Sequence, residues 1–321
     1  MKHRILLAAD SLSRFQPRFD TTLRLATELL RRGHEVDYLD LDELDEKLPP
    51  ERTLATLPVQ KIRTSDADAV PFIEVNDPRP ENGSAYSLIF QRKDPPVDAR
   101  YRFICDVFSQ LPDSVVQINN PKETPRYYEH ELPIFFPSDS IPTFIAEDVD
   151  AFVKAVRAEP VEAVAKPMNE CSGNGVEFFR PDAPREVLAA YFQKWGPRAI
   201  VQPFIDEVTR SGDLRILVMN RKVMGSVLRV PKKGSRLANL HQGASYVAFT
   251  PTPRQLEITK RVANELTPRG LYLLGLDFIG DRLSEINVTS PSALQQINEV
   301  MNTDIAIPLI DECEALMQSK I

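Results

Sequence analysis

Three side chains of types that can bind hard cations lie close together within residues 274–288, where a turn around Asp281 separates two apolar runs. This pattern predicts a β-hairpin. If the hairpin is symmetric about Asp281, Asp277 faces Glu285 across the two strands, and Asn287 lies two residues farther along the same face. The spacing therefore brings two carboxylates and one amide oxygen to one surface of the sheet.

Two facing carboxylates repel each other, so their charge must be compensated. A divalent cation bound by the three oxygens is one solution, and Mg²⁺ fits best where the phosphates of a nucleotide complete its octahedron. The alternative is an acidic pair that arginine neutralises on a solvated face of the sheet. The spacing alone leaves both interpretations open.

Two further segments could bind a nucleotide. Lys166 ends an apolar strand and is followed by the polar, glycine-bearing loop 167–175, which could offer an ammonium and backbone N–H groups to phosphate oxygens. Most lysines at strand ends simply extend into solvent, however. The extended run Gln202–Ile205, with Asp213 after it, could lie along an adenine and hold ribose hydroxyls, although a core strand that leads into a loop explains the same pattern more simply.

Basic residues gather between Arg229 and Asn239, where the sequence also contains Lys232, Lys233 and Arg236. The chain as a whole carries a net charge of −7, and no aromatic residues alternate with these basic ones. Such a stretch favours the anchoring of a small anion over the binding of a nucleic acid.

The first 120 residues have the pattern of a parallel α/β domain. A strand, a helix and a second strand follow one another over residues 4–39 with short turns between them. Residues 48–82 are rich in proline and predict an irregular surface excursion. The next predicted strand, Tyr86–Phe90, runs into Arg92, and ligands bind at the carboxyl ends of strands in open α/β sheets.

A second pattern starts after Asp150. Helices are predicted over residues 150–157, 185–195, 253–266 and 305–317, and strands over 161–166, 176–179 and 199–204. Two hairpins are also predicted, one turning at Asn220-Arg221 and one over residues 273–288. The tight turns favour antiparallel pairing in this part of the chain.

Several common chemistries are excluded. The sequence has no Gly-Lys-Ser/Thr for a P-loop, no Gly-x-Gly-x-x-Gly for a dinucleotide, no Gly-x-Ser-x-Gly elbow and no Cys/His cluster with zinc spacing. Three scattered cysteines argue against a disulfide framework, and no apolar run approaches the roughly 20 residues of a membrane-spanning helix. We therefore expect a reduced, soluble protein of the cytoplasm.

Several motifs, in the same order along nearly the whole chain, closely resemble those of the bacterial glutathione synthetases, which belong to the ATP-grasp superfamily. They are Arg92-Lys-Asp-Pro-Pro96, Lys166-Pro167, Gly212-Asp-Leu-Arg215, Arg229-Val-Pro231, Gly275-Leu-Asp277 and Gly280-Asp-Arg-Leu-Ser-Glu-Ile-Asn-Val-Thr-Ser-Pro291. The resemblance implies an α/β ATP-grasp fold with an N-terminal parallel α/β domain (residues 1–120), a small central lid (121–198) and a C-terminal, largely antiparallel catalytic part (199–321). It also implies an ATP-dependent carboxylate–amine ligase that works through an acyl phosphate.

The same resemblance implies a role for each matching residue. Nucleotide binding is expected at Lys166, Ser172, Gly173, Gly175, Gln202, Pro203, Phe204, Ile205 and Asp213. Mg²⁺, or Mn²⁺ in its place, is expected at Asp277, Glu285 and Asn287. Stabilisation of the acyl phosphate is expected from Arg215 and Arg229, and contact with the substrates from Arg92, Arg236, Asn239, Ser290 and Pro291. A dimer or tetramer that acts on small peptides and amino acids is also expected.

The sequence departs from the family at three places. The glycine-rich central loop is replaced by Asn169-Glu-Cys-Ser-Gly-Asn-Gly175, an upstream nucleotide-binding lysine is replaced by His130 with Lys122 nearby, and a Gly-Gly-Arg is replaced by Gln242-Gly-Ala-Ser-Tyr-Val247. These changes leave two alternatives to glutathione synthesis: a relative with altered substrates, and a nucleotide-binding protein that has lost catalysis.

Overall fold

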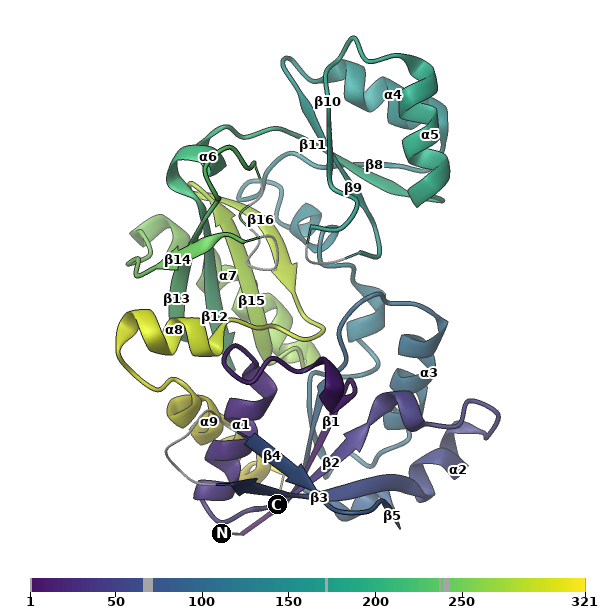
Figure 1. Cartoon of the computed structure of the whole chain (residues 1–321), viewed down its shortest axis with the longest axis vertical. Coiled ribbons are helices and arrows are strands. Elements are labelled where there is room, and N and C mark those ends of the chain that lie inside the picture. Colours follow the sequence, from purple (N-terminus) through teal and green to yellow (C-terminus); the bar gives the residue numbers. More distant parts are fainter. Residues whose placement is uncertain (1, 66–71, 171–172, 237, 239–242, 321) are drawn as a thin grey trace.

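The computed structural model of the chain contains three β-sheets arranged along its long axis (Figure 1). It describes residues 2–65, 72–170, 173–236, 238 and 243–320. The first part of the chain builds the sheet at one end, the middle part builds the sheet at the other end, and the last part builds the sheet between them. The predicted α/β class is confirmed.

The first sheet is parallel at its centre and antiparallel at one edge. Its strands are β1 (Arg4–Ala9), β2 (Glu35–Asp40), β3 (Leu57–Ser65), β4 (Phe72–Val75), β5 (Arg79–Glu81), β6 (Leu88–Arg92) and β7 (Val116–Ile118), in the order β4-β3-β2-β1-β6-β7 with β5 beside β3. The helices of this part are α1 (Thr21–Arg31), α2 (Pro50–Ala55) and α3 (Ala99–Phe108). Asp20 caps α1, because its carboxylate accepts a hydrogen bond from the backbone N–H of Leu23 (2.9 Å).

The prediction of an irregular excursion over residues 48–82 is wrong. The described part of this segment contains α2, β3, β4 and β5. Three of its prolines occupy positions that regular structure tolerates, since Pro50 begins α2, and Pro58 faces Pro80 where β3 pairs with the short outer strand β5. Leu54 and Leu57 are buried, so the segment contributes to the core.

The second sheet is antiparallel, and two helices cover it. Its strands are β8 (Phe144–Ala146), β9 (Ala163–Pro167), β10 (Glu177–Phe179) and β11 (Ala199–Pro203), in the order β10-β9-β11-β8, and its helices are α4 (Val149–Ala158) and α5 (Arg185–Trp195). Phe152 of α4 stacks on Tyr191 of α5, with ring centroids 5.4 Å apart. The division predicted between residues 198 and 199 falls just before β11, although β11 pairs with β8 and β9 of this sheet.

The third sheet lies between the other two and is also antiparallel. Its strands are β12 (Asp213–Met219), β13 (Lys222–Val230), β14 (Ser245–Val247), β15 (Leu273–Ile279) and β16 (Arg282–Asn287), in the order β14-β13-β12-β15-β16. Helices α6 (Glu207–Ser211), α7 (Pro253–Leu266), α8 (Leu294–Met301) and α9 (Ala306–Gln318) belong to this part. The predicted turn at Asn220-Arg221 is confirmed, and both residues have positive φ, as a two-residue hairpin turn requires.

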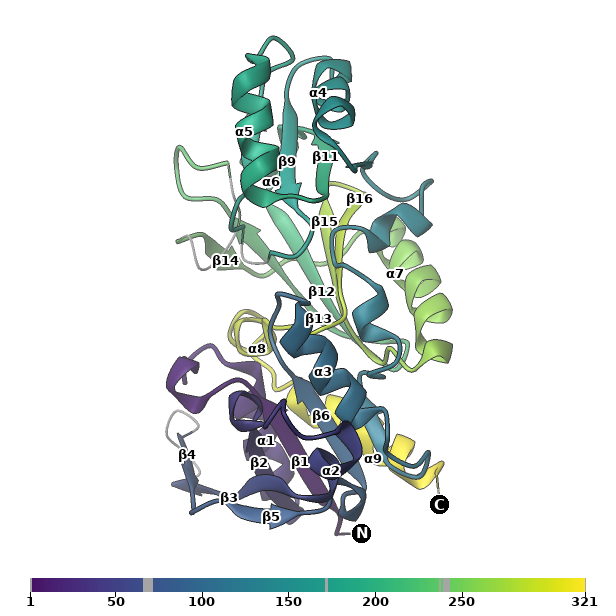
Figure 2. The same ribbon diagram turned by 90° about the vertical axis from the view of Figure 1, so that its right-hand side faces the viewer.

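The two faces of the third sheet pack against different partners. Helix α7 covers one face (Figure 2), and the buried side chains between them include Ile258 and Leu276. On the other face, Leu217 belongs to a core that continues through α8 and α9 to β1 and α1. The end of the chain therefore joins the third sheet to the N-terminal part. No helix in the described ranges is long and apolar enough to cross a membrane.

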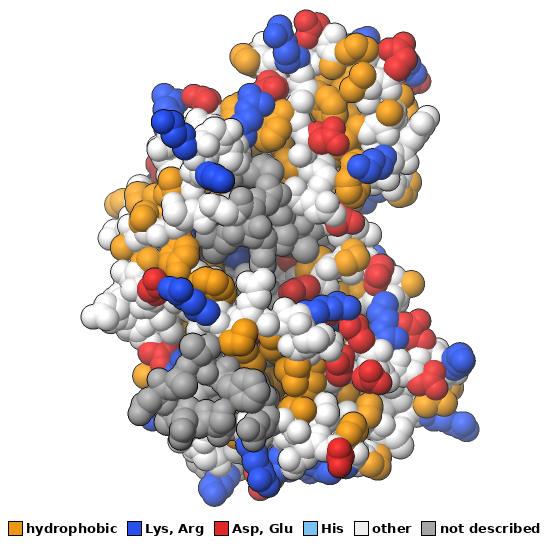
Figure 3. All heavy atoms as spheres, in the orientation of Figure 1, with side chains coloured by type: hydrophobic (Ala, Val, Ile, Leu, Met, Phe, Trp, Pro, Cys, Tyr) orange, Lys and Arg blue, Asp and Glu red, His pale blue; other side chains and the backbone are white. Residues whose placement is uncertain are grey.

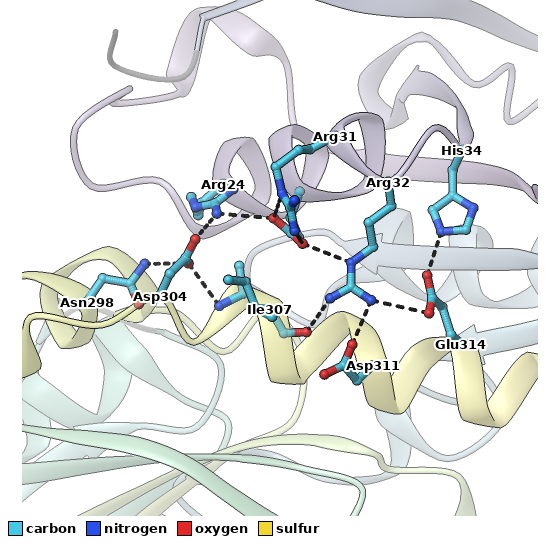
Figure 4. A network of polar contacts seen from close by, with 11 residues as sticks. Arg24, Arg31, Arg32, His34, Asn298, Asp304, Ile307, Asp311 and Glu314 are labelled. Atoms are coloured by element: carbon cyan, nitrogen blue, oxygen red, sulfur yellow. Dashed lines mark hydrogen bonds and ion pairs between the residues drawn. The ribbon is translucent and has the colours of Figure 1, made fainter. Parts of the chain in front are cut away.

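An ionic network fastens the N-terminal helix α1 to the C-terminal helix α9 (Figure 4). Its centre is Glu28, a fully buried carboxylate that Arg31 and Arg32 contact at 2.7 and 2.8 Å. Arg32 also reaches Asp311 of α9 (2.7 Å). Burial alone would raise the pKa of Glu28, but the hydrogen bonds from both arginines outweigh burial and lower the pKa to about 2.

Since the pKa of Glu28 is lowered by folding, Glu28 stabilises the protein above the pKa of the unfolded chain and loses this effect as pH falls toward 2. We expect Glu28→Gln to remove up to about 3 kcal/mol of stability at neutral pH and to flatten the loss of stability between about pH 4.5 and pH 2. Urea unfolding at several pH values measures this, with the exposed Glu43→Gln as a control that follows the wild type. An unchanged pH dependence in Glu28→Gln would contradict the assignment.

Candidate active site

A cavity of about 810 Å³ lies where the three sheets meet. Side chains from all three parts line it, including Arg92 from the end of β6, Lys166 from β9 and Glu285 from β16. The space-filling view shows the molecule indented between the second sheet and the N-terminal part (Figure 3). Carboxyl ends of parallel strands bind ligands in open α/β sheets, and Asp10 and Arg92 lie at such ends.

The hairpin of β15 and β16 has the predicted pairing at its chemical residues. Asp277 faces Glu285, and Gly275 faces Asn287. Nearer the turn the register shifts, because Ser284 is the extra residue of a β-bulge and its hydroxyl donates to the backbone oxygen of Asp277 (3.1 Å). The expected pairing about Asp281 is therefore correct from the carboxylates to Asn287, and it is shifted by one residue between the carboxylates and the turn.

Asp277 is almost fully buried and is held by two arginines. Arg215 on the neighbouring strand β12 contacts both of its oxygens, with Nη2 at 2.8 Å from Oδ2, and Arg229 on β13 lies 2.9 Å from Oδ2. Arginine thus neutralises this carboxylate, as the second interpretation of the sequence requires. The face is buried, however, and not solvated as that interpretation expects, since Asp277 and Arg215 are only 1% and 5% exposed.

Glu285 is compensated by different cations. Lys166 reaches it from the second sheet (Nζ–Oε1, 3.1 Å), and Nδ1 of His130 lies 3.1 Å from the same oxygen. Burial would raise the pKa of Glu285, but the charges of His130 and Lys166 outweigh burial and hold the pKa well below its ordinary range. The facing carboxylates are therefore compensated separately, Asp277 from within the third sheet and Glu285 from outside it.

Asp213 adds a third carboxylate beside Arg229, whose Nη2 donates to Oδ2 (2.6 Å). Burial raises the pKa of Asp213 to about 7, against the opposing charge of Arg229. Its other oxygen, Oδ1, is buried and accepts no hydrogen bond from the described residues. A ligand hydroxyl that donates to Oδ1 would satisfy it.

Aromatic rings surround the end of the cavity formed by the second sheet. Phe178 and Phe204 meet edge to face with centroids 5.5 Å apart, and the guanidinium of Arg236 lies over both rings at 4.7 and 4.6 Å. Arg236 also pairs with Glu162. Gln202 donates to the Thr143 hydroxyl (2.8 Å). Arg236, expected to contact the substrates, thus lies against Phe204, which is expected to bind the nucleotide.

The opposite end of the cavity is formed by the N-terminal part and the segment after β16. Arg92 is buried, and it donates to the hydroxyl of Thr22 (3.1 Å) and to the backbone oxygen of Pro291 (2.9 Å). Ser290 lines the cavity here, beside Asp94. The structure therefore brings together Arg92, Ser290 and Pro291, which lie about 200 positions apart in the chain.

Most of the predicted site residues line this one cavity: Lys166, Gly173, Gln202, Pro203, Phe204, Ile205, Asp213, Arg215, Arg229, Glu285, Asn287, Arg92, Arg236 and Ser290. Asp277 and Pro291 do not line the cavity themselves, but they accept hydrogen bonds from the lining residues Arg215 and Arg92. Gly175 packs against the second sheet instead, because a Cβ there would lie 2.5 Å from Pro167 and 2.9 Å from Trp195. Ser172 and Asn239, together with Cys171, fall outside the described residues.

The sequence reasoning missed Glu129, Thr289 and Asp10, which also line the cavity. Glu129 precedes His130 in a segment with no periodic pattern. Its only sequence clue is its position next to the residue that replaces the lysine of the family.

Family models match nearly the whole chain. Residues 3–124 match the N-terminal domain of prokaryotic glutathione synthetase, and residues 131–302 match its ATP-grasp domain. The chain belongs to the prokaryotic glutathione synthetase family. The resemblance expected from the motifs is therefore confirmed.

Curated relatives match this chain over nearly their full length. The glutathione synthetase of Rhodopseudomonas palustris is 28% identical over 98% of this chain and 99% of its own, and that of Bradyrhizobium diazoefficiens is 29% identical over 98% of both. Among solved structures, the D-cycloserine synthetase DcsG (TM-score 0.67, 14% identity) covers 99% of this chain and 100% of its own. The D-alanyl-alanine synthetase A of Vibrio cholerae (TM-score 0.64, 10% identity) covers 99% of both chains. These structures support the ATP-grasp fold.

As a member of this family, the protein is an ATP-grasp ligase that uses ATP to form an amide bond. The family uses ATP and a divalent metal. The comparisons support this activity and give no support to the alternative of a catalytically inactive nucleotide-binding protein.

Asp277→Asn removes the carboxylate that neutralises two buried arginines. Breaking one partner of a buried ion pair typically costs about 3–5 kcal/mol, and we expect a loss of this size in urea unfolding. The matched control is Asp182→Asn, whose partner Arg180 is as exposed as Asp182 itself (76% each), and which should change stability by less than about 0.5 kcal/mol. Equal stability of Asp277→Asn and the wild type would show that the arginines do not depend on Asp277.

Proposed function

We propose that this glutathione synthetase family member joins the cysteine carboxylate of γ-glutamylcysteine to the amine of glycine, through an acyl phosphate made with ATP. The observation that carries the proposal is the match of both family models and of full-length relatives named glutathione synthetase to a chain with its charged residues gathered in one cavity.

Arg215 and Arg229 are proposed to stabilise the acyl phosphate and the charge that develops when it forms. Both guanidiniums are fixed beforehand by Asp277 and Asp213, so little reorganisation is needed when a phosphate arrives. Arg215 also donates to the backbone oxygen of Ser292 (3.3 Å), which joins the arginine to the acceptor end of the cavity. We propose that Arg92 and Ser290 contact the peptide there, with Pro291 holding Arg92 in place.

ATP is proposed to lie between the second and third sheets. Lys166 faces the cavity and would bind phosphate oxygens, together with the loop that contains Gly173. The run Gln202–Ile205 would lie along the adenine. Asp213 fits the ribose, because its unpartnered Oδ1 is an acceptor for a sugar hydroxyl.

The donor set of the hairpin fits a hard divalent cation. Glu285 and Asn287 both line the cavity, and Asn287 uses its Nδ2 to donate to Gly275 (3.2 Å), which leaves Oδ1 available as a ligand. No group of three His, Cys, Asp or Glu side chains in the described residues could hold a metal alone. We therefore propose Mg²⁺, with Mn²⁺ as a substitute, held by Glu285 and Asn287 and by phosphate oxygens. Asp277, the third expected ligand, would add its negative charge beside the ion while Arg215 and Arg229 hold its carboxylate. The ion would supply positive charge to the phosphates during transfer.

A relative with an altered amine substrate is the second candidate. Tyr246 lines the cavity in the segment where the family has Gly-Gly-Arg, and its hydroxyl donates to Glu299 (2.8 Å). Assembly into a dimer or tetramer stays a prediction.

The deciding experiment measures ADP and phosphate release with ATP, Mg²⁺ and γ-glutamylcysteine, while the amine is varied. Turnover with glycine that exceeds turnover with other amino acids and amines is the expected result. Turnover that requires the peptide but prefers another amine would favour the second candidate, and no turnover with any peptide–amine pair would contradict both.

Glu285→Gln leaves Lys166 and His130 without their carboxylate partner, so we expect a lower thermal midpoint in a protein that still folds. Ligase turnover should fall by at least about a hundredfold through loss of the metal ligand. The measurements are the thermal midpoint and steady-state turnover, with the exposed lid variant Glu147→Gln as an active control. Undiminished turnover in Glu285→Gln would contradict the metal assignment.

A further inference from the structure

Glu129 is a carboxylate of the active-site cavity that has no role in the functions proposed above. It lies in the segment between the first and second sheets. Its backbone oxygen accepts a hydrogen bond from the N–H of Ile286 (3.2 Å), and its Oε1 accepts one from the hydroxyl of Thr289 (2.5 Å). Two contacts with β16 and the residues after it thus fix the main chain and the carboxyl group beside the catalytic hairpin.

The second oxygen of Glu129 is available. No described residue donates a hydrogen bond to Oε2, and no arginine or lysine forms an ion pair with this carboxylate among the described residues. The charged and titratable groups whose fields reach it are His130 of its own segment, Glu285 of β16, Arg215 of β12 and Tyr101 of α3. Burial raises the pKa of Glu129 to about 7, in spite of the hydrogen bond from Thr289.

The other carboxylates in and beside the cavity are engaged. Asp20 caps α1 through the N–H of Leu23, and Asp94 interacts with Ser290 and Arg92. Asp277 is held by two arginines, Asp213 by Arg229, and Asp10 pairs with Lys93. Glu285 is neutralised by Lys166 and His130, and its pKa lies well below the ordinary range, so it is a weak base. A general base works best when its pKa lies near the working pH and when one oxygen is free to accept the proton. Glu129 meets both conditions. Asp213 also has a raised pKa and a free Oδ1, but Arg229 forms an ion pair with it, and that oxygen is assigned to the ribose.

We propose that Glu129 is the general base that takes a proton from the incoming ammonium group, so that the free amine attacks the acyl phosphate. The inference rests on the proposed function. The Oε2 of Glu129 accepts one proton, and the nitrogen lone pair forms the C–N bond. The bond from the acyl carbon to the phosphate oxygen breaks, and phosphate leaves with that electron pair. The second proton of the nitrogen passes to the phosphate, and Glu129 releases its proton to solvent.

The test compares an amine that needs a base with one that does not. Glycine is mostly protonated near neutral pH, whereas hydroxylamine is mostly unprotonated and reacts with an acyl phosphate directly to give a hydroxamate. In Glu129→Gln, which keeps an acceptor for Thr289, kcat with glycine should fall by about 10²–10⁴-fold while KM for ATP stays constant. Hydroxamate formation should remain within a few-fold of wild type.

Three variants keep the test decisive. Glu129→Asp retains a carboxylate and should restore part of the glycine turnover lost in Glu129→Gln. The neighbour Glu131→Gln, whose side chain instead pairs with Arg198 (3.2 Å), should behave as wild type with both nucleophiles. Equal losses with glycine and hydroxylamine in a folded Glu129→Gln protein, or undiminished glycine turnover, would overturn the proposal. Absence of hydroxamate from the wild-type enzyme with ATP and peptide would instead count against the acyl phosphate itself.

Discussion

The active site depends on one electrostatic constraint, which is that two carboxylates face each other on a single hairpin. Asp277 and Glu285 would repel strongly without compensating cations. The structure neutralises them from different directions, with Arg215 and Arg229 on neighbouring strands for Asp277 and with Lys166 and His130 from outside the sheet for Glu285. The cations that a phosphate would meet are therefore already in place before it arrives.

The same pairs hold the three parts of the chain around the cavity. Lys166 joins the second sheet to the third through Glu285, and Arg92 joins the first sheet to the segment after β16 through the backbone of Pro291. Farther from the cavity, the network around Glu28 fastens α1 to the C-terminal helix α9. Charged contacts thus set the positions of the elements that present the catalytic residues, while the apolar cores stabilise each layer.

Much of this arrangement could be predicted from the sequence because its signals are local. The period of α1, the turn at Asn220-Arg221 and the pairing of Asp277 with Glu285 each depend on residues a few positions apart. The strands within residues 48–82 could not be predicted from the sequence. Prolines are typical of loops, and only the pairing of β3 with the short outer strand β5 shows that a strand tolerates them here. The contact of Asp277 with Arg215 and that of Glu129 with Thr289 could not be predicted either, because they join residues 62 and 160 positions apart.

The central claim, that the cavity forms an amide through an acyl phosphate, is tested most directly by following oxygen. The measurement uses γ-glutamylcysteine with ¹⁸O in its cysteine carboxylate, together with unlabelled ATP and glycine, and determines the label in the released phosphate by mass spectrometry. The account predicts one ¹⁸O atom in each phosphate formed with the tripeptide product, because that oxygen bridges carbon and phosphorus in the intermediate. Amide formation with unlabelled phosphate would contradict it.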